Sequence, residues 1–245
     1  MRSLVAVLAL NGGNSVERKE ICSWIWREGE SPVSADGALY TCVSRLRNLL
    51  NRSMGGGGEL MIDTTPGGYS LTVDRSDVDA LRFESSLRRA RADQRLGRMG
   101  SALHGFEEAL GFWSGPALAN ISPTDPVLAE SVSLNEARFG AELDLIGVSL
   151  RMGRGLEVLD RVSGLVVKNP FVESVSYLYM TALSQCGRRS EAISHYREVY
   201  RSMRAELGSV PSIELQNLHT ALLQGRAASD GLDISFGEPA QLRPW

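Results

Sequence analysis

The pattern of apolar and polar positions in the first quarter of this chain predicts short helices followed by a hairpin. Each expected helix has apolar residues at helical spacing, and Gly or Pro residues separate one helix from the next. Two runs with strand patterns flank a Pro-Gly-Gly turn, which predicts a β-hairpin. The expected helices are 4–10, Ser15 or Glu17 to Trp26, and about 34–51; the expected strands are 60–64 and 69–73. Between the last helix and the hairpin, Gly55–Gly58 predict a flexible link.

From Ser76 to about Leu223 the chain contains only helical patterns, and part of the pattern repeats. Three glycines are each followed by a small or aliphatic residue after five positions and by an apolar or aromatic residue after nine. The second and third of them are 34 residues apart, which is the period of tetratricopeptide repeats. The three sets are Gly97, Ala102 and Phe106; Gly153, Val158 and Val162; and Gly187, Ala192 and Tyr196. A plain helical bundle with chance spacing is the alternative.

Together these patterns predict a mainly α protein. A short helix, a second helix, a third helix and a hairpin, in that order, are typical of a winged helix-turn-helix, and we expect it to occupy residues 1–75. An all-helical, tetratricopeptide-like domain is expected over residues 76–224. Residues 225–245 lack periodicity, so we expect a disordered tail there.

The third expected helix has two faces of different chemistry. Leu39, Val43, Leu46 and Leu50 fall on one side, whereas the opposite side is small, polar and cationic. Such a face suits the major groove of double-stranded DNA, since Arg and Asn can contact base edges and other Arg can contact phosphates. The candidate DNA-binding residues are Gly37, Thr41, Ser44, Arg45, Arg47, Asn48 and Arg52 on the helix, and Thr64 and Thr65 at the hairpin tip. Taken alone, an amphipathic helix with three arginines is more often an ordinary surface helix.

Charge and composition narrow the function classes. The formal net charge is −3, so bulk charge attracts no nucleic acid, although Gly37–Arg52 contains three arginines and no acid. The three cysteines and three histidines are isolated, so neither a disulfide framework, nor a metal site, nor a cofactor is expected. Walker, nucleophile-elbow and HExxH motifs are absent from the sequence, so we expect no enzyme. The longest apolar run is far too short to span a membrane, and a cytoplasmic location is expected.

Several segments resemble known bacterial regulators. Residues 38–50 resemble the recognition helix of OmpR-type winged-helix regulators, and residues 64–69 resemble their wing. Residues 76–223 resemble the bacterial transcriptional activator domain, most clearly at 106–118, 187–192 and 196–208. In this order, the segments resemble the actinobacterial antibiotic regulatory proteins, the SARP family.

The resemblance implies a transcriptional activator of a secondary-metabolite gene cluster. It implies binding to direct repeats near a promoter through the third helix and wing, contact with RNA polymerase and its sigma factor, and self-association as a homodimer. The family's winged helix begins with a small antiparallel sheet, and Met1 falls almost at the first helix here, so that sheet is expected to be missing. Relatives carry a capping Ser where Glu17 stands, and Ser15 is the expected substitute cap.

A second reading keeps the helical repeats and drops DNA binding. In that case the repeats form a scaffold for protein interaction, and the N-terminal region is degenerate. The Gly37–Arg52 face distinguishes the two readings, because only the first requires it to be free and cationic.

Overall fold

A computed structural model describes residues 1–53 and 61–226. The predicted four-glycine link and nearly all of the predicted tail lie outside these residues. The described chain forms two compact units. The first contains residues 1–86 and 108–138, and the second contains 87–107 and the described residues from 139 onward.

The N-terminal elements occur in the predicted order, with one addition. The helices are α1 (Arg2–Leu10), α2 (Arg18–Ile25) and α3 (Ala35–Ser53), and the strands are β1 (Val16–Glu17), β2 (Met61–Thr65) and β3 (Gly68–Thr72). The sequence pattern did not predict β1, because two residues are too few to show alternation. It pairs antiparallel with β3, so the hairpin becomes a three-stranded sheet of order β1-β3-β2. Within the described residues, no strand precedes α1.

The start of α2 differs from the prediction. Glu17 occupies the N-cap position, and its side chain makes no capping hydrogen bond. Ser15 is not a substitute cap, because its hydroxyl lies 2.5 Å from the Thr65 hydroxyl and links the segment before β1 to the hairpin. Instead, the backbone N–H of Arg18 donates to the Gly67 carbonyl at 3.1 Å, so the sheet satisfies one donor at this helix end.

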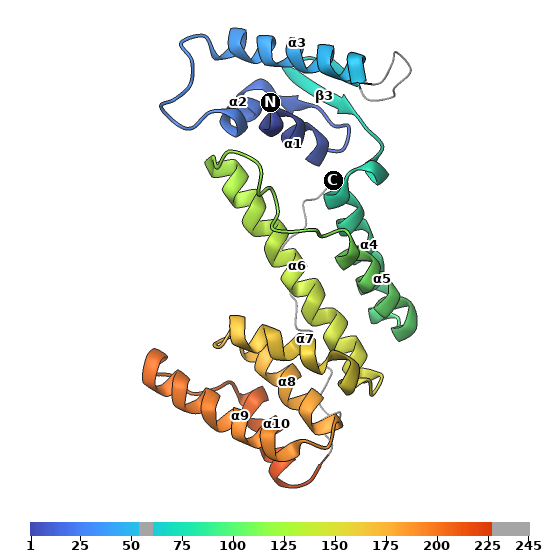
Figure 1. The fold of residues 1–245 in the computed structure, drawn as a ribbon, viewed down its shortest axis with the longest axis vertical. Helices are drawn as coiled ribbons and strands as arrows, with labels where there is room; N and C mark the ends of the chain where they lie inside the picture. The colour runs from blue at the N-terminus through green and yellow to red at the C-terminus, as the bar shows by residue number, and fades with distance from the viewer. Residues whose placement is uncertain (54–60, 227–245) are drawn as a thin grey trace. The chain divides into compact units, whose positions relative to one another are not determined.

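One apolar core joins all the N-terminal elements (Figure 1). Leu4 and Leu8 of α1, Trp24 of α2 and Val43 of α3 are almost fully buried in it. Val127 belongs to the same core although it lies far along the chain, in α6. The described chain has no helix long and apolar enough to cross a membrane.

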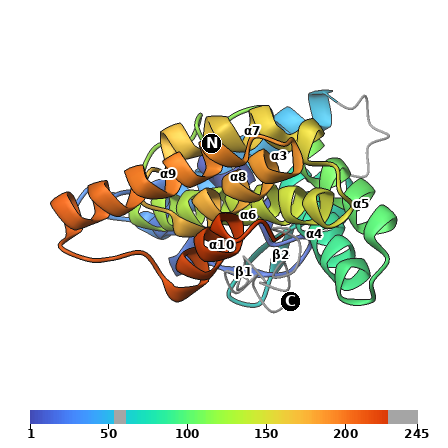
Figure 2. The same cartoon turned by 90° about the horizontal axis from the view of Figure 1, so that it is seen from below.

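The rest of the described chain is helical, as the pattern predicted. The helices are α4 (Asp79–Arg95), α5 (Met99–Gly111), α6 (Asp125–Arg151), α7 (Gly155–Lys168), α8 (Glu173–Gln185), α9 (Arg189–Ser202) and α10 (Ile213–Leu223), with single turns η1 (Arg75–Asp77) and η2 (Met203–Leu207). In the second unit, α8 packs against both α7 and α9, and α10 packs against α8 and α9 (Figure 2).

The three repeat glycines end helices in the same way. Gly97, Gly153 and Gly187 have φ between 72° and 74°, the left-handed conformation that favours glycine. The residue after each is an arginine whose backbone N–H donates to the carbonyl five residues earlier, at 2.8 to 3.0 Å. This bond is the signature of a Schellman turn. A fourth such turn, which the repeat search did not detect, lies at Gly225 (φ 77°), where Arg226 N–H donates to the Ala221 carbonyl.

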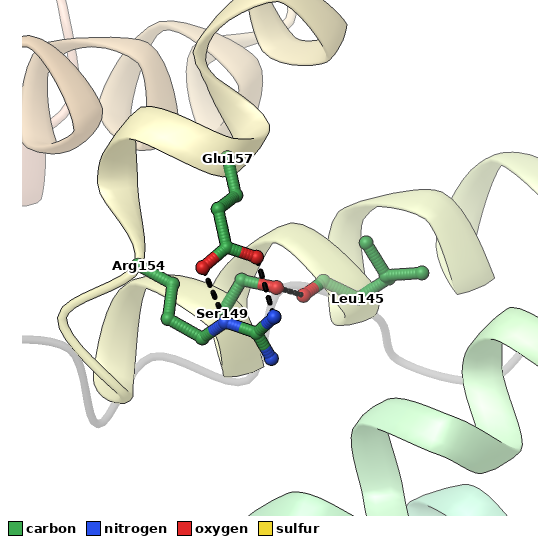
Figure 3. A network of polar contacts seen from close by, with 4 residues as sticks. All are labelled: Leu145, Ser149, Arg154 and Glu157. Carbon is green, nitrogen blue, oxygen red and sulfur yellow. Dashed lines mark hydrogen bonds and ion pairs between the residues drawn. The ribbon is translucent and has the colours of Figure 1, made fainter.

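Side chains follow the same 34-residue period. Arg154 pairs with Glu157 just after the Gly153 turn (Figure 3). The Ser149 hydroxyl, which donates to the Leu145 carbonyl in the helix before that turn, does not repeat, because Leu183 stands 34 residues later. Arg188 pairs with Glu191 in the equivalent place after Gly187. The residues at the +5 and +9 positions of all three sets are buried. These equivalent contacts favour the repeat over a bundle with chance spacing.

Candidate nucleic-acid interface

The apolar side of α3 fixes which face of the helix is free. Leu39, Val43 and Leu46 are buried in the N-terminal core, and α3 contacts α2 and β2 (Figure 1). At the start of the helix, the Ser34 hydroxyl accepts a hydrogen bond from Gly37 N–H at 3.4 Å, which is an N-cap arrangement. Packing of these apolar residues therefore determines which side of α3 faces outward, as their spacing in the sequence predicted.

Most of the candidate residues lie on the opposite, exposed side. Gly37, Thr41, Ser44, Arg45, Asn48 and Arg52 are all exposed. The Thr41 hydroxyl donates to the Gly37 carbonyl at 2.9 Å, which leaves its oxygen free to accept. Among the described residues, the Arg45 side chain makes no hydrogen bond or ion pair, so its donors are available to a ligand.

Arg47 lies on the flank and is only half-buried, unlike the other two arginines of α3. Its Nε donates to the Ile62 carbonyl, and its Nη2 donates to the Thr64 hydroxyl, both at 2.9 Å. Its guanidinium carbon lies 5.9 Å from the centre of the Tyr69 ring. Arg47 thus joins α3 to both strands of the hairpin, and only part of its donor capacity remains for a phosphate.

The hairpin tip is also held in place. Thr64 is exposed and accepts from Arg47, whereas Thr65 is half-buried and bonded to Ser15. The exposed residues between the strands are Pro66 and Gly67. The structure thus brings the hairpin and α3 together through Arg47, which the sequence pattern alone could not show.

Sequence reasoning missed an exposed tyrosine on this face and two exposed cations beside the hairpin. Tyr40 is 65% exposed and stands four residues before Ser44, one helical turn away on the same side. Arg18 and Lys19 are exposed at the start of α2, next to the hairpin residue Gly67. An exposed tyrosine at helical spacing was a signal in the sequence. The position of Arg18 depends on β1, which the pattern did not reveal.

The described residues offer no rival chemistry at this face. They contain no cluster of three or more His, Cys, Asp or Glu side chains that could hold a metal ion. Cys22 and Cys42 are free thiols in α2 and α3, and burial raises the pKa of the Cys22 thiol, which disfavours the reactive thiolate.

Comparison with known proteins identifies several related regulators. Residues 78–223 match the family model of the bacterial transcriptional activator domain. The chain is 29% identical to the regulatory protein DnrI of Streptomyces peucetius over 95% of its own length and 85% of that protein. It is 28% identical to the transcriptional regulator RedD of Streptomyces coelicolor over 91% of its own length and 63% of that protein.

A solved structure shares the fold. The structure of Mycobacterium tuberculosis EmbR in complex with a low-affinity phosphopeptide superposes with a TM-score of 0.85 and 24% sequence identity. The superposition covers 96% of this chain and 62% of that one. The family model covers more than half of the chain, and the relatives agree with it. The chain therefore belongs to the bacterial transcriptional activator domain family, and within it to the actinobacterial antibiotic regulatory proteins, the SARP family.

Proposed function

We propose that this protein is a DNA-binding transcriptional activator, a pathway-specific regulator of a secondary-metabolite gene cluster. In this proposal α3 lies in the major groove, and the hairpin formed by β2 and β3 lies beside it. Residues 1–75 supply DNA binding, and residues 76–224 form the activator domain. One observation carries the proposal: α3 buries Leu39, Val43 and Leu46 and exposes, on the opposite side, an acid-free face on which the Arg45 donors are unoccupied.

The chemistry of that face suits sequence reading. Arg45 presents adjacent donors, and Asn48 presents a donor and an acceptor. Each side chain can therefore form two hydrogen bonds with one base edge. Small residues such as Gly37 and Ser44 allow the backbone to approach the groove closely. Arg52, near the helix end, would contact phosphate, and exposed Arg18 and Lys19 would add phosphate contacts from α2.

The proposed partners follow from the family. The activator domain would contact RNA polymerase and its sigma factor, and two protomers would bind the two half-sites of a direct repeat. DnrI and RedD are named as regulatory proteins, which supports a regulatory role and gives no support to an enzyme.

Salt-dependent binding to promoter DNA tests the proposal. The full chain should bind specific sites in the upstream regions of neighbouring genes in a gel shift, and its affinity should fall steeply from low to physiological salt, because phosphate contacts release counterions. Arg201→Ala, an exposed arginine of α9, is a matched control that should leave the affinity unchanged. Absence of binding, or a flat salt profile, would support the interaction scaffold instead.

A further inference from the structure

Tyr40 is a large and exposed side chain in the first half of α3. Its exposed fraction is 65%, and its hydroxyl makes no hydrogen bond with any described residue. The neighbouring residues of the exposed face are small, namely Gly37, Thr41 and Ser44. Tyrosine is enriched where a side chain presents an apolar ring and a polar tip to a partner. Tyr40 has both groups available for a bound molecule.

Tyr40 and Arg47 lie on the same flank of α3. Because seven residues are almost two full helical turns, the two side chains leave the helix within about 20° of each other and about 10 Å apart along its axis. Arg47 shows which flank this is, since it donates to the Ile62 carbonyl and the Thr64 hydroxyl of the hairpin. Tyr40 therefore lies on the hairpin side of α3, about a quarter turn from the centre of the exposed face.

A position on this flank suits contact with the DNA backbone. When a helix lies in the major groove, side chains at the centre of its outer face meet base edges, and side chains on its flanks meet the sugar–phosphate strands that border the groove. The hairpin occupies the Nε and Nη2 donors of Arg47. The Tyr40 hydroxyl, by contrast, is a donor on the same flank that no described residue uses.

The charges around Tyr40 are compatible with a phosphate. The acid nearest to it in the sequence is Asp36, which lies in the first turn of α3, where the positive end of the helix macrodipole offsets its charge. The segment Gly37–Arg52 contains no acid. A phenol hydroxyl is uncharged at neutral pH and carries one donor hydrogen. Its hydrogen bond to an anionic oxygen is stronger than a hydrogen bond between two neutral groups.

We infer that the Tyr40 hydroxyl donates a hydrogen bond to one phosphate of the bound DNA and so fixes the position of α3 in the groove. A contact of this kind sets the register of the helix without reading a base. The inference rests on the proposed function, since it requires α3 to lie in the major groove. It adds a backbone contact to the base contacts that Arg45 and Asn48 supply.

Replacement of single phosphates tests this inference. In a promoter site that the full chain binds, each phosphate is exchanged in turn for an uncharged methylphosphonate, and the affinity is measured by fluorescence anisotropy. The unmodified chain is compared with Tyr40→Phe and Tyr40→Ala. Tyr200→Phe is the matched control, because it removes a phenol hydroxyl from an exposed tyrosine of α9. Thermal unfolding checks that each variant folds.

Tyr40→Phe keeps the ring and removes only the hydroxyl. It should bind the site about tenfold more weakly than the unmodified chain, because a hydrogen bond to a charged acceptor is lost. The loss should be the same on every sequence variant of the site. Methylphosphonate at one phosphate should weaken binding of the unmodified chain by a similar factor, and binding of Tyr40→Phe by less than about twofold. Tyr200→Phe should match the unmodified chain throughout.

Each of the other outcomes overturns the inference. If the unmodified chain binds no promoter site, the proposed function fails and the inference fails with it. If the unmodified chain binds, two results overturn the inference alone: Tyr40→Phe binds as tightly, or it binds more weakly but responds to every methylphosphonate as the unmodified chain does. Tight binding by Tyr40→Phe together with weak binding by Tyr40→Ala would place the ring against a base, and the phosphate contact would be wrong.

Discussion

Arg47 differs from the other arginines of α3 in what its guanidinium contacts. Its two hydrogen bonds, to Ile62 and Thr64, make it a positioning residue that holds the hairpin against the helix. A helical wheel cannot show this role, because the wheel describes one helix without its neighbours. The sequence listed Arg47 among the candidate DNA-binding residues, and the structure adds its contacts with the hairpin.

Replacing Arg47 should therefore destabilise the first unit. We predict that Arg47→Met lowers the free energy of unfolding by about 1–2 kcal/mol, because hydrogen bonds from a charged donor to Ile62 and Thr64 are lost. Arg45→Met, at an exposed position on the same helix, should change it by less than about 0.5 kcal/mol. Urea unfolding of both variants is the measurement, and equal losses would argue against the positioning role.

His195 connects the stability of the second unit to pH. Its Nε2 lies 3.1 Å from the Ser176 hydroxyl, and its ring meets Tyr179 edge to face, with ring centres 5.0 Å apart. Burial lowers the pKa of His195 below the ordinary 6.5, although Glu198 opposes the shift. Well above pH 6.5 the imidazole is neutral in both states. As the pH falls through that value, the unfolded chain takes up a proton before the folded chain does, and stability is lost.

His195→Gln should remove this part of the pH dependence. The unmodified chain should lose free energy of unfolding between pH 7.5 and pH 5.5, roughly the range around an ordinary histidine pKa. The variant should lose less, although His219, whose pKa burial also lowers, keeps its own contribution. Urea unfolding at the two pH values measures the difference, and identical slopes for both proteins would contradict the assignment.

At the scale of elements, the sheet depends on a close approach at Gly68. A Cβ on Gly68 would lie 1.9 Å from the Val16 carbonyl oxygen, in the pairing of β1 with β3. A side chain at the neighbouring Gly67 would meet nothing within 4 Å, so only its φ of 88° opposes substitution there.

These two glycines form a matched pair for substitution. Gly67→Ala should lower the free energy of unfolding by about 1–2 kcal/mol, because a residue with a side chain is strained in the left-handed conformation. Gly68→Ala should lower the free energy of unfolding by clearly more than Gly67→Ala does, because the new side chain forces β1 away from β3. Thermal unfolding of the two variants compares them, and a Gly68→Ala variant as stable as Gly67→Ala would show that the β1 pairing is not needed.

Elements with long patterns could be predicted from the sequence, whereas short or distant contacts could not. The third helix, expected over about 34–51, is α3 at Ala35–Ser53, and it could be predicted because its apolar residues repeat over about three turns. Strand β1 has only two residues, so no periodicity could reveal it. The same helical spacing also predicted that the candidate DNA-binding residues lie on the exposed face of α3. Their contacts with DNA stay a prediction.

At the scale of the whole molecule, the N-terminal core includes residues from the activator segment. Val127 of α6 is buried among the N-terminal elements, and the Thr124 hydroxyl donates to the Trp24 carbonyl at 3.4 Å. Arg27 also donates to the Pro123 carbonyl, at 3.2 Å. A sequence pattern cannot show contacts between residues a hundred positions apart.

Val127 and its neighbour Leu128 test this connection. Val127→Ala should lower the free energy of unfolding by about 1–3 kcal/mol, because it leaves a cavity in the core. Leu128 is 51% exposed, so Leu128→Ala should have little effect. Urea unfolding of both variants, followed by circular dichroism, is the measurement; equal losses of the free energy of unfolding would show that Val127 of α6 does not stabilise the N-terminal core.

The central claim is that the exposed face of α3 reads base pairs, and Arg45 tests it most directly. The measurement is the affinity of Arg45→Ala for a promoter site and for every single-base-pair variant of that site, beside Arg52→Ala. We predict that Arg45→Ala weakens binding to the site by about 1–3 kcal/mol and removes the preference at one base pair, whereas Arg52→Ala weakens binding to all sequences alike. Unchanged promoter binding by Arg45→Ala, or a loss that is uniform over all sequences, would contradict the claim.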